Sequence, residues 1–196
     1  MVTEMRRERL FTPEEYLLVE RQAPEKSEFY DGRIYAMSGG SPTHALIPPN
    51  IVMALGSRLG DRPCRIFSSD LKVCTPTFDS FMYPDLSIVC GELRHFDSHR
   101  DVVANPLVVV EVLSPSTMDF DRGLKLLRYQ SIPALEDYVV VYQDRPQVEI
   151  HHRHTEDHWD TTIYRGQEAV ARLVALDCVL SLSEIYRLVE FESPAG

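Results

Sequence analysis

The sequence lacks the features that mark membrane, secreted and multidomain chains. No apolar run reaches the roughly 18 residues that a helix needs to cross a bilayer. The charged segment from Met1 to Leu10 is followed by no apolar signal region, and no Ser/Gly-rich or Pro-rich linker divides the 196 residues. We therefore expect a soluble, cytoplasmic protein that folds as one domain over residues 1–196, with its core at about 11–189.

Cysteine is scarce, and the four cysteines are widely separated. Cys64, Cys74, Cys90 and Cys178 form no CxxC motif and lie mostly within apolar segments. This arrangement is typical of reduced thiols in a core, and it fits neither a disulfide framework nor a zinc site. We therefore expect four reduced, structural cysteines.

Positive charge is in deficit, with 20 Lys and Arg against 30 Asp and Glu and a formal net charge of −10. Phosphate binding depends on basic contacts that release counterions, so a nucleic-acid-binding protein with this charge needs local basic clusters. Two candidate clusters are present: Arg6, Arg7 and Arg9, and Arg122, Lys125 and Arg128. Both are interleaved with acids, so solvated helix faces explain them equally well.

Two acidic side chains lie in otherwise apolar stretches. Glu111 interrupts the apolar run 107–113, which is typical of a strand buried on both faces. Asp85 follows Pro84 and precedes the apolar run 86–90. Because an unpaired buried carboxylate is strongly unfavourable, Glu111 must be neutralised, hydrogen-bonded or bound to a cation.

Local patterns predict a mixed α/β chain. Thr12, Pro13 and Glu15 form a helix start with a capping box, and Asp31-Gly32 is a two-residue hairpin signal. Apolar strands at 107–113 and 138–142, separated by a helix, predict a right-handed parallel crossover.

Further elements follow from breakers and spacing. The pair Pro48-Pro49 predicts that a helix is secure only from Asn50 to about residue 59, and 65–75 resembles one strand. The helix after Glu111 is expected to begin at Thr117 or Asp119 and to end near Tyr129. Its core-facing positions are predicted to be Phe120, Leu124 and Leu127.

The chemistry of Asp85 and Glu111 depends on whether their strands are neighbours. If they are, the two carboxylates suit Mg²⁺ or Mn²⁺, which lowers the pKa of a bound water and stabilises charge on a phosphoryl oxygen. Lys125 on the following helix can lean toward them, although an i, i+4 pair with Asp121 is the simpler explanation. Without a third group, the acids fit equally a structural metal site or a hydrogen-bonded core pair.

Several motifs, in order, resemble the Uma-two family of endonucleases in the PD-(D/E)XK restriction-endonuclease-like superfamily. The resemblance extends from about Phe11 to Val189. The motifs are Glu28 to Gly32, Ala36 to Gly39 with His44, Tyr83 to Asp85, Val110 to Thr117, and Asp121 to Tyr129 with Lys125.

The resemblance implies a mixed β-sheet flanked by helices, with an N-terminal helix and hairpin. It also implies a DNA substrate and a Mg²⁺ (or Mn²⁺) site in which Asp85 and Glu111 are ligands and Glu28 is a supporting acid. Taken alone, Glu28 reads as a solvent-facing strand residue and His44 as an ordinary hydrogen-bonded histidine.

The sequence departs from the superfamily pattern at the lysine. That lysine normally lies two residues after the acid, where this chain has Leu113. Lys125 is therefore the proposed substitute, and Lys72 is the reserve. We expect a metal-dependent DNA endonuclease with catalytic Asp85, Glu111, Lys125 and Glu28. We expect no membrane partner and leave open whether the protein forms a homo-oligomer. The alternative function is that of a catalytically degenerate member of the fold that acts as a binding or assembly module.

Overall fold

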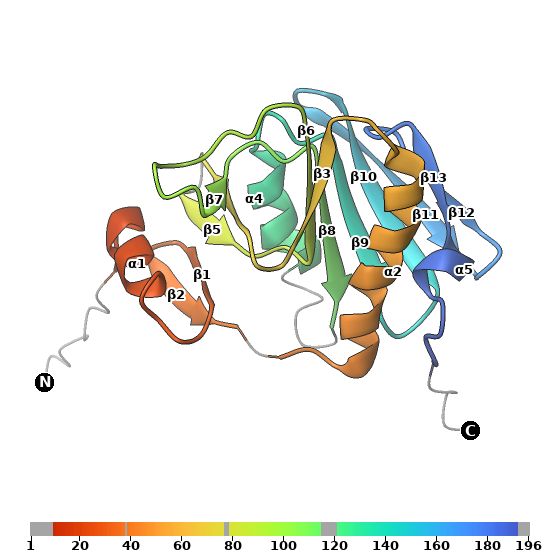
Figure 1. The fold of residues 1–196 in the computed structure, drawn as a ribbon, viewed down its shortest axis with the longest axis horizontal. Helices are drawn as coiled ribbons and strands as arrows, with labels where there is room; N and C mark the ends of the chain where they lie inside the picture. Colours follow the sequence, from red (N-terminus) through yellow and green to blue (C-terminus); the bar gives the residue numbers. More distant parts are fainter. Residues whose placement is uncertain (1–9, 38, 77–78, 115–120, 192–196) are drawn as a thin grey trace, which may run out of the picture.

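The computed structural model describes residues 10–37, 39–76, 79–114 and 121–191 (Figure 1). Its helical elements are α1 (Pro13–Glu20), α2 (Pro42–Leu59), the π-helical turn η1 (Asp121–Lys125), α4 (Leu126–Gln130) and α5 (Leu182–Ile185). Its strands are β1 (Ser27–Tyr30), β2 (Arg33–Ala36), β3 (Cys64–Ser68), β4 (Lys72–Thr75), β5 (Ser80–Met82), β6 (Leu86–Cys90), β7 (Val102–Val103), β8 (Val108–Leu113), β9 (Asp137–Tyr142), β10 (Gln147–Thr155), β11 (His158–Arg165), β12 (Val170–Leu173) and β13 (Cys178–Ser181).

A six-stranded mixed sheet in the order β11-β10-β9-β8-β6-β3 forms the centre of the fold. β8 and β9 pair in parallel, as the predicted crossover requires, while the other pairs are antiparallel. α2 lies over one face of this sheet and α4 over the other (Figure 1). The predicted α/β fold, with a mixed sheet flanked by helices, is confirmed.

Strand β8 is buried on both faces, which explains its continuous apolar sequence. Val108, Val110 and Val112 pack into the core on the α2 side. Val109 and Leu113 pack into the core on the α4 side. Because side chains alternate along a strand, Glu111 shares the α4 face with Val109 and Leu113.

The N-terminal elements join a second sheet in the order β2-β1-β5-β4-β7. The capping box of α1 forms between Thr12 and Glu15, as predicted. Asp31 and Gly32 have φ values of 54° and 73°, the two positive values that this type of hairpin turn requires. The predicted N-terminal helix and hairpin are confirmed.

The expected start of the second helix at Asn50 is wrong. α2 begins at Pro42, with Ser41 as its cap, and continues through Pro48 and Pro49. The Asn50 amide instead donates to the carbonyls of Ile185 and Arg187, at 3.0 and 2.8 Å. Two prolines remove only two helical N–H donors, and packing of the apolar face of α2 against the sheet outweighs that loss.

Two further local predictions are wrong. Residues 65–75 divide between β3 and β4, which belong to different sheets, because the chain turns at 69–71. Leu124 and Leu127 are 54% and 56% exposed, whereas Lys125 and Tyr129 are buried. The π-helical turn changes the angular spacing of side chains, so a 3.6-residue period misassigns the buried face. Phe120, Thr117 and Asp119 lie outside the described residues.

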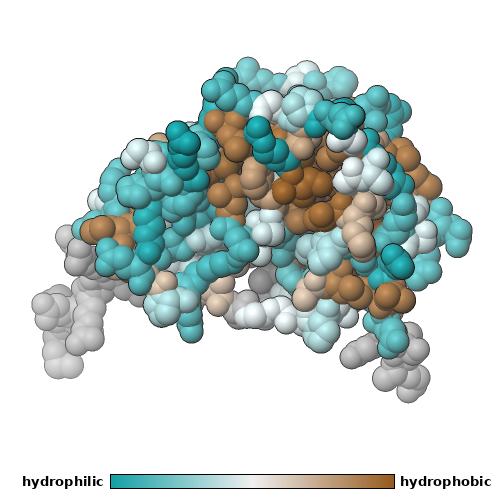
Figure 2. All heavy atoms as spheres, viewed as in Figure 1, coloured by the Kyte–Doolittle hydropathy of each residue, from teal (hydrophilic) through white to brown (hydrophobic). Residues whose placement is uncertain are grey.

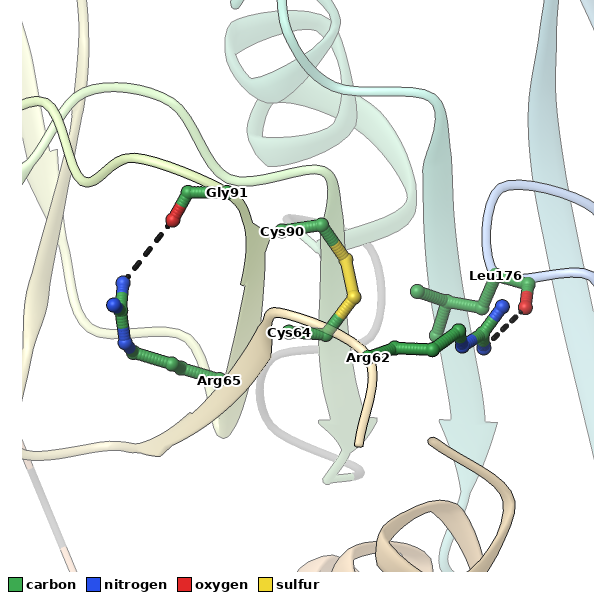
Figure 3. Close-up of a disulfide and its surroundings, with 6 residues drawn as sticks. All are labelled: Arg62, Cys64, Arg65, Cys90, Gly91 and Leu176. Carbon is green, nitrogen blue, oxygen red and sulfur yellow. Dashed lines mark hydrogen bonds between the residues drawn. A yellow bond between two sulfur atoms is a disulfide. The ribbon is translucent and has the colours of Figure 1, made fainter. Parts of the chain in front are cut away.

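The expectation of four reduced cysteines is wrong for one pair. Cys64 and Cys90 form a disulfide (Figure 3), and Cys74 and Cys178 are free thiols. The antiparallel register of β3 and β6 places Cys64 opposite Cys90, with 3.9 Å between their Cα atoms. Because the two cysteines are 26 residues apart in the sequence, their spacing alone did not indicate that they lie opposite each other on neighbouring strands.

The surface is divided by polarity. Figure 2 shows hydrophobic residues gathered over the six-stranded sheet, with hydrophilic residues around them, while the N-terminal elements present a mostly hydrophilic face. Among the described residues, no helix is long and apolar enough to cross a membrane.

Candidate active site

Three of the predicted site residues meet between the two sheets. Lys125, at the end of η1, places Nζ 3.0 Å from Oε1 of Glu111 in β8 and 3.2 Å from Oε1 of Glu28 in β1. Lys125, Glu111 and Glu28 are only 6%, 4% and 8% exposed. A buried ammonium therefore bridges two buried carboxylates, which accounts for the neutralisation that Glu111 requires.

Asp85 lies beside Glu111 because β6 and β8 are neighbours. Leu86 pairs with Val110, so Asp85 is one step further along, at the position opposite Glu111. The Val112 N–H donates to Oδ2 of Asp85 at 2.7 Å, which ties this carboxylate to the residue that follows Glu111. Backbone pairing thus makes the strands of the two acids neighbours, which is the condition on which the predicted carboxylate pair depends.

Glu28 fixes the segment that leads to Asp85. Its Oε1 accepts a hydrogen bond from the backbone N–H of Tyr83 at 3.0 Å. The solvent-facing reading of Glu28 is therefore wrong, because β1 lies next to β5 and turns this side chain inward. The resemblance to the endonuclease family, and not the local pattern, is what pointed to Glu28.

Tyr129 also belongs to the site, although it was not among the predicted site residues. Its hydroxyl donates to Oε1 of Glu111 at 3.0 Å. Burial, followed by the negative charge of Glu111, raises the pKa of Tyr129 far above its ordinary value, so the phenol stays a protonated donor. The sequence did carry a signal, because Lys125 and Tyr129 are four residues apart on one helical stripe.

His44 approaches Asp85 from the first turn of α2. Its Nε2 lies 3.5 Å from Oδ2 of Asp85, and its backbone N–H donates to Oγ of Ser41 at 3.1 Å. A Cβ on Gly40 would lie 2.8 Å from Nδ1 of His44, so the absence of a side chain at Gly40 makes room for the ring. The sequence alone could not place His44 here, because Pro48 and Pro49 left the segment before them without a predicted helix.

Lys72 lies in a separate buried network. Its Nζ is 2.7 Å from Glu20 and 3.1 Å from Asp101, and it donates to the Tyr83 hydroxyl at 3.1 Å. The hydroxyl of Tyr83 in turn donates to Glu20. Lys125 is therefore the lysine in contact with Glu111, while Lys72 joins α1 to the five-stranded sheet.

The acidic side chains of the site limit how a divalent cation can be held. Within the described ranges, no group of three or more His, Cys, Asp or Glu side chains is arranged to hold a metal ion. Asp85 and Glu111 provide a two-carboxylate set, which suits Mg²⁺ because this ion keeps several waters. In number and type, these two carboxylates are suited to a largely hydrated magnesium ion, and they do not form an all-protein cage.

A cleft of about 980 Å³ opens beside these groups. Asp85 and His44 line it, and their side chains are 15% and 22% exposed. Glu111, Lys125 and Glu28 lie deeper in the protein. A substrate would therefore meet Asp85 and His44 first.

Comparison with known proteins gives consistent matches. The Uma2 family model, described as "Putative restriction endonuclease", matches residues 13–183. Uncharacterized protein slr1290 of Synechocystis sp. is 33% identical over 180 residues, covering 92% of this chain and 93% of the relative. Uncharacterized protein sll1609 of the same organism is 34% identical over 161 residues, covering 82% and 91%.

A solved structure shares the fold. The crystal structure of a "putative nuclease belonging to DUF820" from Anabaena variabilis matches with a TM-score of 0.73 and 17% identity, covering 90% of this chain and 97% of that one. At this identity the likeness establishes the fold alone.

Proposed function

Because this chain belongs to the Uma2 family of restriction-endonuclease-like proteins, we propose that it is a metal-dependent endonuclease that hydrolyses DNA phosphodiester bonds. The observation that carries the proposal is that Lys125 contacts Glu111 at 3.0 Å, while Asp85, hydrogen-bonded to the N–H of the neighbouring Val112, lines an open cleft. A purely structural ion pair would not require a second carboxylate at the cleft wall, in contact with a histidine.

In this proposal, Asp85 and Glu111 hold Mg²⁺ or Mn²⁺. When bound, such an ion acidifies a water molecule and stabilises charge on the scissile phosphate. The Val112 N–H fixes the carboxylate of Asp85, and the Tyr129 hydroxyl fixes that of Glu111. His44 acts as a positioning residue for Asp85 from the cleft side.

Lys125 takes the role that Leu113 cannot. Leu113 is buried among apolar side chains on the α4 side of β8. Lys125 reaches the same face of the strand from η1 and contacts Glu111, whose side chain is one alternation from Leu113. Its positive charge stabilises the negative charge that develops on the phosphate, and Glu28 holds the ammonium in place.

The decisive experiment is a manganese-dependent cleavage assay on single-stranded, duplex and nicked DNA, comparing wild type with Asp85→Asn. Asparagine keeps an acceptor for the Val112 N–H while removing the negative charge, so it separates ligand chemistry from folding. Asp61→Asn, an exposed acid in the turn after α2, is the matched control.

We expect cleavage by wild type and Asp61→Asn and its loss in Asp85→Asn. Equal cleavage by all three proteins would remove Asp85 from the mechanism. No cleavage by the wild type on any substrate would reject the endonuclease and favour a binding or assembly module with this fold.

A further inference from the structure

The cleft beside Asp85 has an unusual lining for a DNA-cleaving site. It is enclosed by the turn before α2, the first turns of α2 and the end of β3. Its apolar lining includes Val52 and Met53, which are 37% and 56% exposed on α2, and Met37, which follows β2. At about 980 Å³ the cleft is large enough for a nucleotide-sized ligand.

The two prolines of α2 leave two backbone carbonyls of the helix without their usual hydrogen bonds. Pro48 and Pro49 have no N–H, so the carbonyls of His44 and Ala45 lack their helical donors. All four residues line the cleft. Backbone carbonyls, together with the hydroxyls of Ser68 and Ser69, are suited to the amino and imino groups of a nucleobase.

Charge in the cleft argues against a surface that follows paired DNA backbones. Of the described residues that line it, Lys26 is the one lysine or arginine, and it forms an ion pair with Asp70. Its Nζ also donates to the Ser69 carbonyl at 3.0 Å. Binding of duplex phosphates requires several basic contacts, whereas an unpaired base is held chiefly by apolar contacts and hydrogen bonds to its edges.

Building on the proposed nuclease function, we infer that this cleft binds an unpaired nucleobase of the DNA next to the scissile phosphate. The base lies between Met37 on one side and Val52 and Met53 on the other, and the α2 carbonyls read its edge. The substrate is therefore a single strand, or a duplex that carries an extrahelical nucleotide.

The test is fluorescence anisotropy of full-length protein with labelled DNA in EDTA, where a metal-dependent nuclease does not cut. Four probes are compared: a single strand, the same strand with abasic sites, a perfect duplex, and a duplex with one bulged base. The cleft variant is Met53→Asp. Leu18→Asp is the matched control, because it adds the same charge at an exposed apolar position of α1, outside the cleft.

We expect wild type to bind the single strand or the bulged duplex more tightly than the perfect duplex. Met53→Asp should weaken that binding at least about fivefold, the loss expected for one stacked base, while Leu18→Asp should leave it unchanged. Abasic sites should weaken the wild type to a similar degree and have little further effect on Met53→Asp. The relative affinities for single strand and bulged duplex identify which source supplies the base.

Equal affinity of wild type and Met53→Asp, or tightest binding to the perfect duplex, would overturn the inference, as would the absence of any DNA binding. Manganese-dependent cleavage of the same probes separates the two proposals. If the wild type and Met53→Asp cut duplex DNA equally well, the nuclease proposal stands and the inference of a nucleobase-binding cleft is rejected. If the protein binds unpaired DNA but does not cut it, the inference of a nucleobase-binding cleft stands and the nuclease proposal is rejected.

Discussion

Lys125 and Lys72 are both buried lysines held by two carboxylates, but their surroundings differ. Lys125 contacts Glu111, a proposed metal ligand. Lys72 contacts Glu20 and Asp101, which join α1 to the five-stranded sheet. Comparing the two lysines therefore separates the loss of a buried ion pair from the loss of a catalytic charge.

We predict that Lys125→Met and Lys72→Met each lower the free energy of unfolding by about 3–5 kcal/mol, because each leaves buried acids without a cation. Only Lys125→Met should also lower the rate of cleavage, by roughly a hundredfold or more. Urea unfolding gives the first quantity. Cleavage rates at a temperature where circular dichroism shows both variants folded give the second. Parallel activity losses in the two variants would refute the assignment of Lys125.

The position of His44 depends on a neighbouring glycine. A methyl group at Gly40 would lie 2.8 Å from Nδ1 of His44, so Gly40→Ala must move the ring away from Asp85. A methyl group at Gly39 would meet no atom within 4 Å, which makes Gly39→Ala a closely matched control.

We predict that Gly40→Ala raises the manganese concentration for half-maximal cleavage by about tenfold, as is typical when a partner of a metal ligand is disturbed. Gly39→Ala should behave as wild type, and both variants should unfold at similar urea concentrations. The measurement is a manganese titration of the cleavage rate. If Gly40→Ala titrates as Gly39→Ala does, His44 does not position Asp85.

At the scale of elements, α1 is attached to the loop before β7 by one arginine. Arg21, at the end of α1, donates to both carboxylate oxygens of Asp101 at 3.0 and 2.7 Å, and to Asp97 at 2.7 Å. The hydrogen bond from Arg21, aided by Lys72, holds the pKa of Asp101 well below its ordinary value. Asp101 therefore stabilises the folded state in its charged form.

This depressed pKa gives a pH prediction. Asp101 contributes stability above its unfolded-state pKa of about 3.9, and the contribution is lost as pH falls toward the folded-state pKa. We expect Asp101→Asn to be less stable than wild type at neutral pH and the difference to shrink on acidification below pH ~4. Urea unfolding between pH ~2 and ~6 measures it. A constant difference over that range would contradict the expected linkage.

At the scale of the whole molecule, the net charge of −10 limits how DNA can bind. Among the described residues that line the proposed cleft, Lys26 is the one lysine or arginine. Each phosphate contact to a single strand contributes about −0.7 to the slope of log affinity against log salt. Few contacts therefore imply a weak salt dependence.

We predict a slope of about −0.7 for single-stranded DNA, the value for one phosphate contact by Lys26, and a slope near zero in Lys26→Gln. Anisotropy titrations over a range of KCl concentrations, in the buffer used for the cleft variants, provide the measurement. A slope steeper than about −4 would show that a basic surface outside the cleft carries the binding.

Several features followed from the sequence because each depends on neighbouring residues. The capping box at Thr12 and Glu15 and the positive-φ turn at Asp31-Gly32 are local conformational preferences. The apolar run around Glu111 required burial on both faces, and burial in turn required a partner for its charge. The resemblance to the endonuclease family added Glu28, which no local rule singles out.

Tertiary structure alone decided which distant groups meet. Cross-strand register joined Cys64 to Cys90, and the packing of α2 carried a helix through two prolines and brought His44 to Asp85. The tertiary structure placed Lys125, at the end of the π-helical turn, beside Glu111, and it placed Lys72 elsewhere. These outcomes depend on the balance between local preference and burial energy summed over many contacts, a balance that spacing along the chain does not encode.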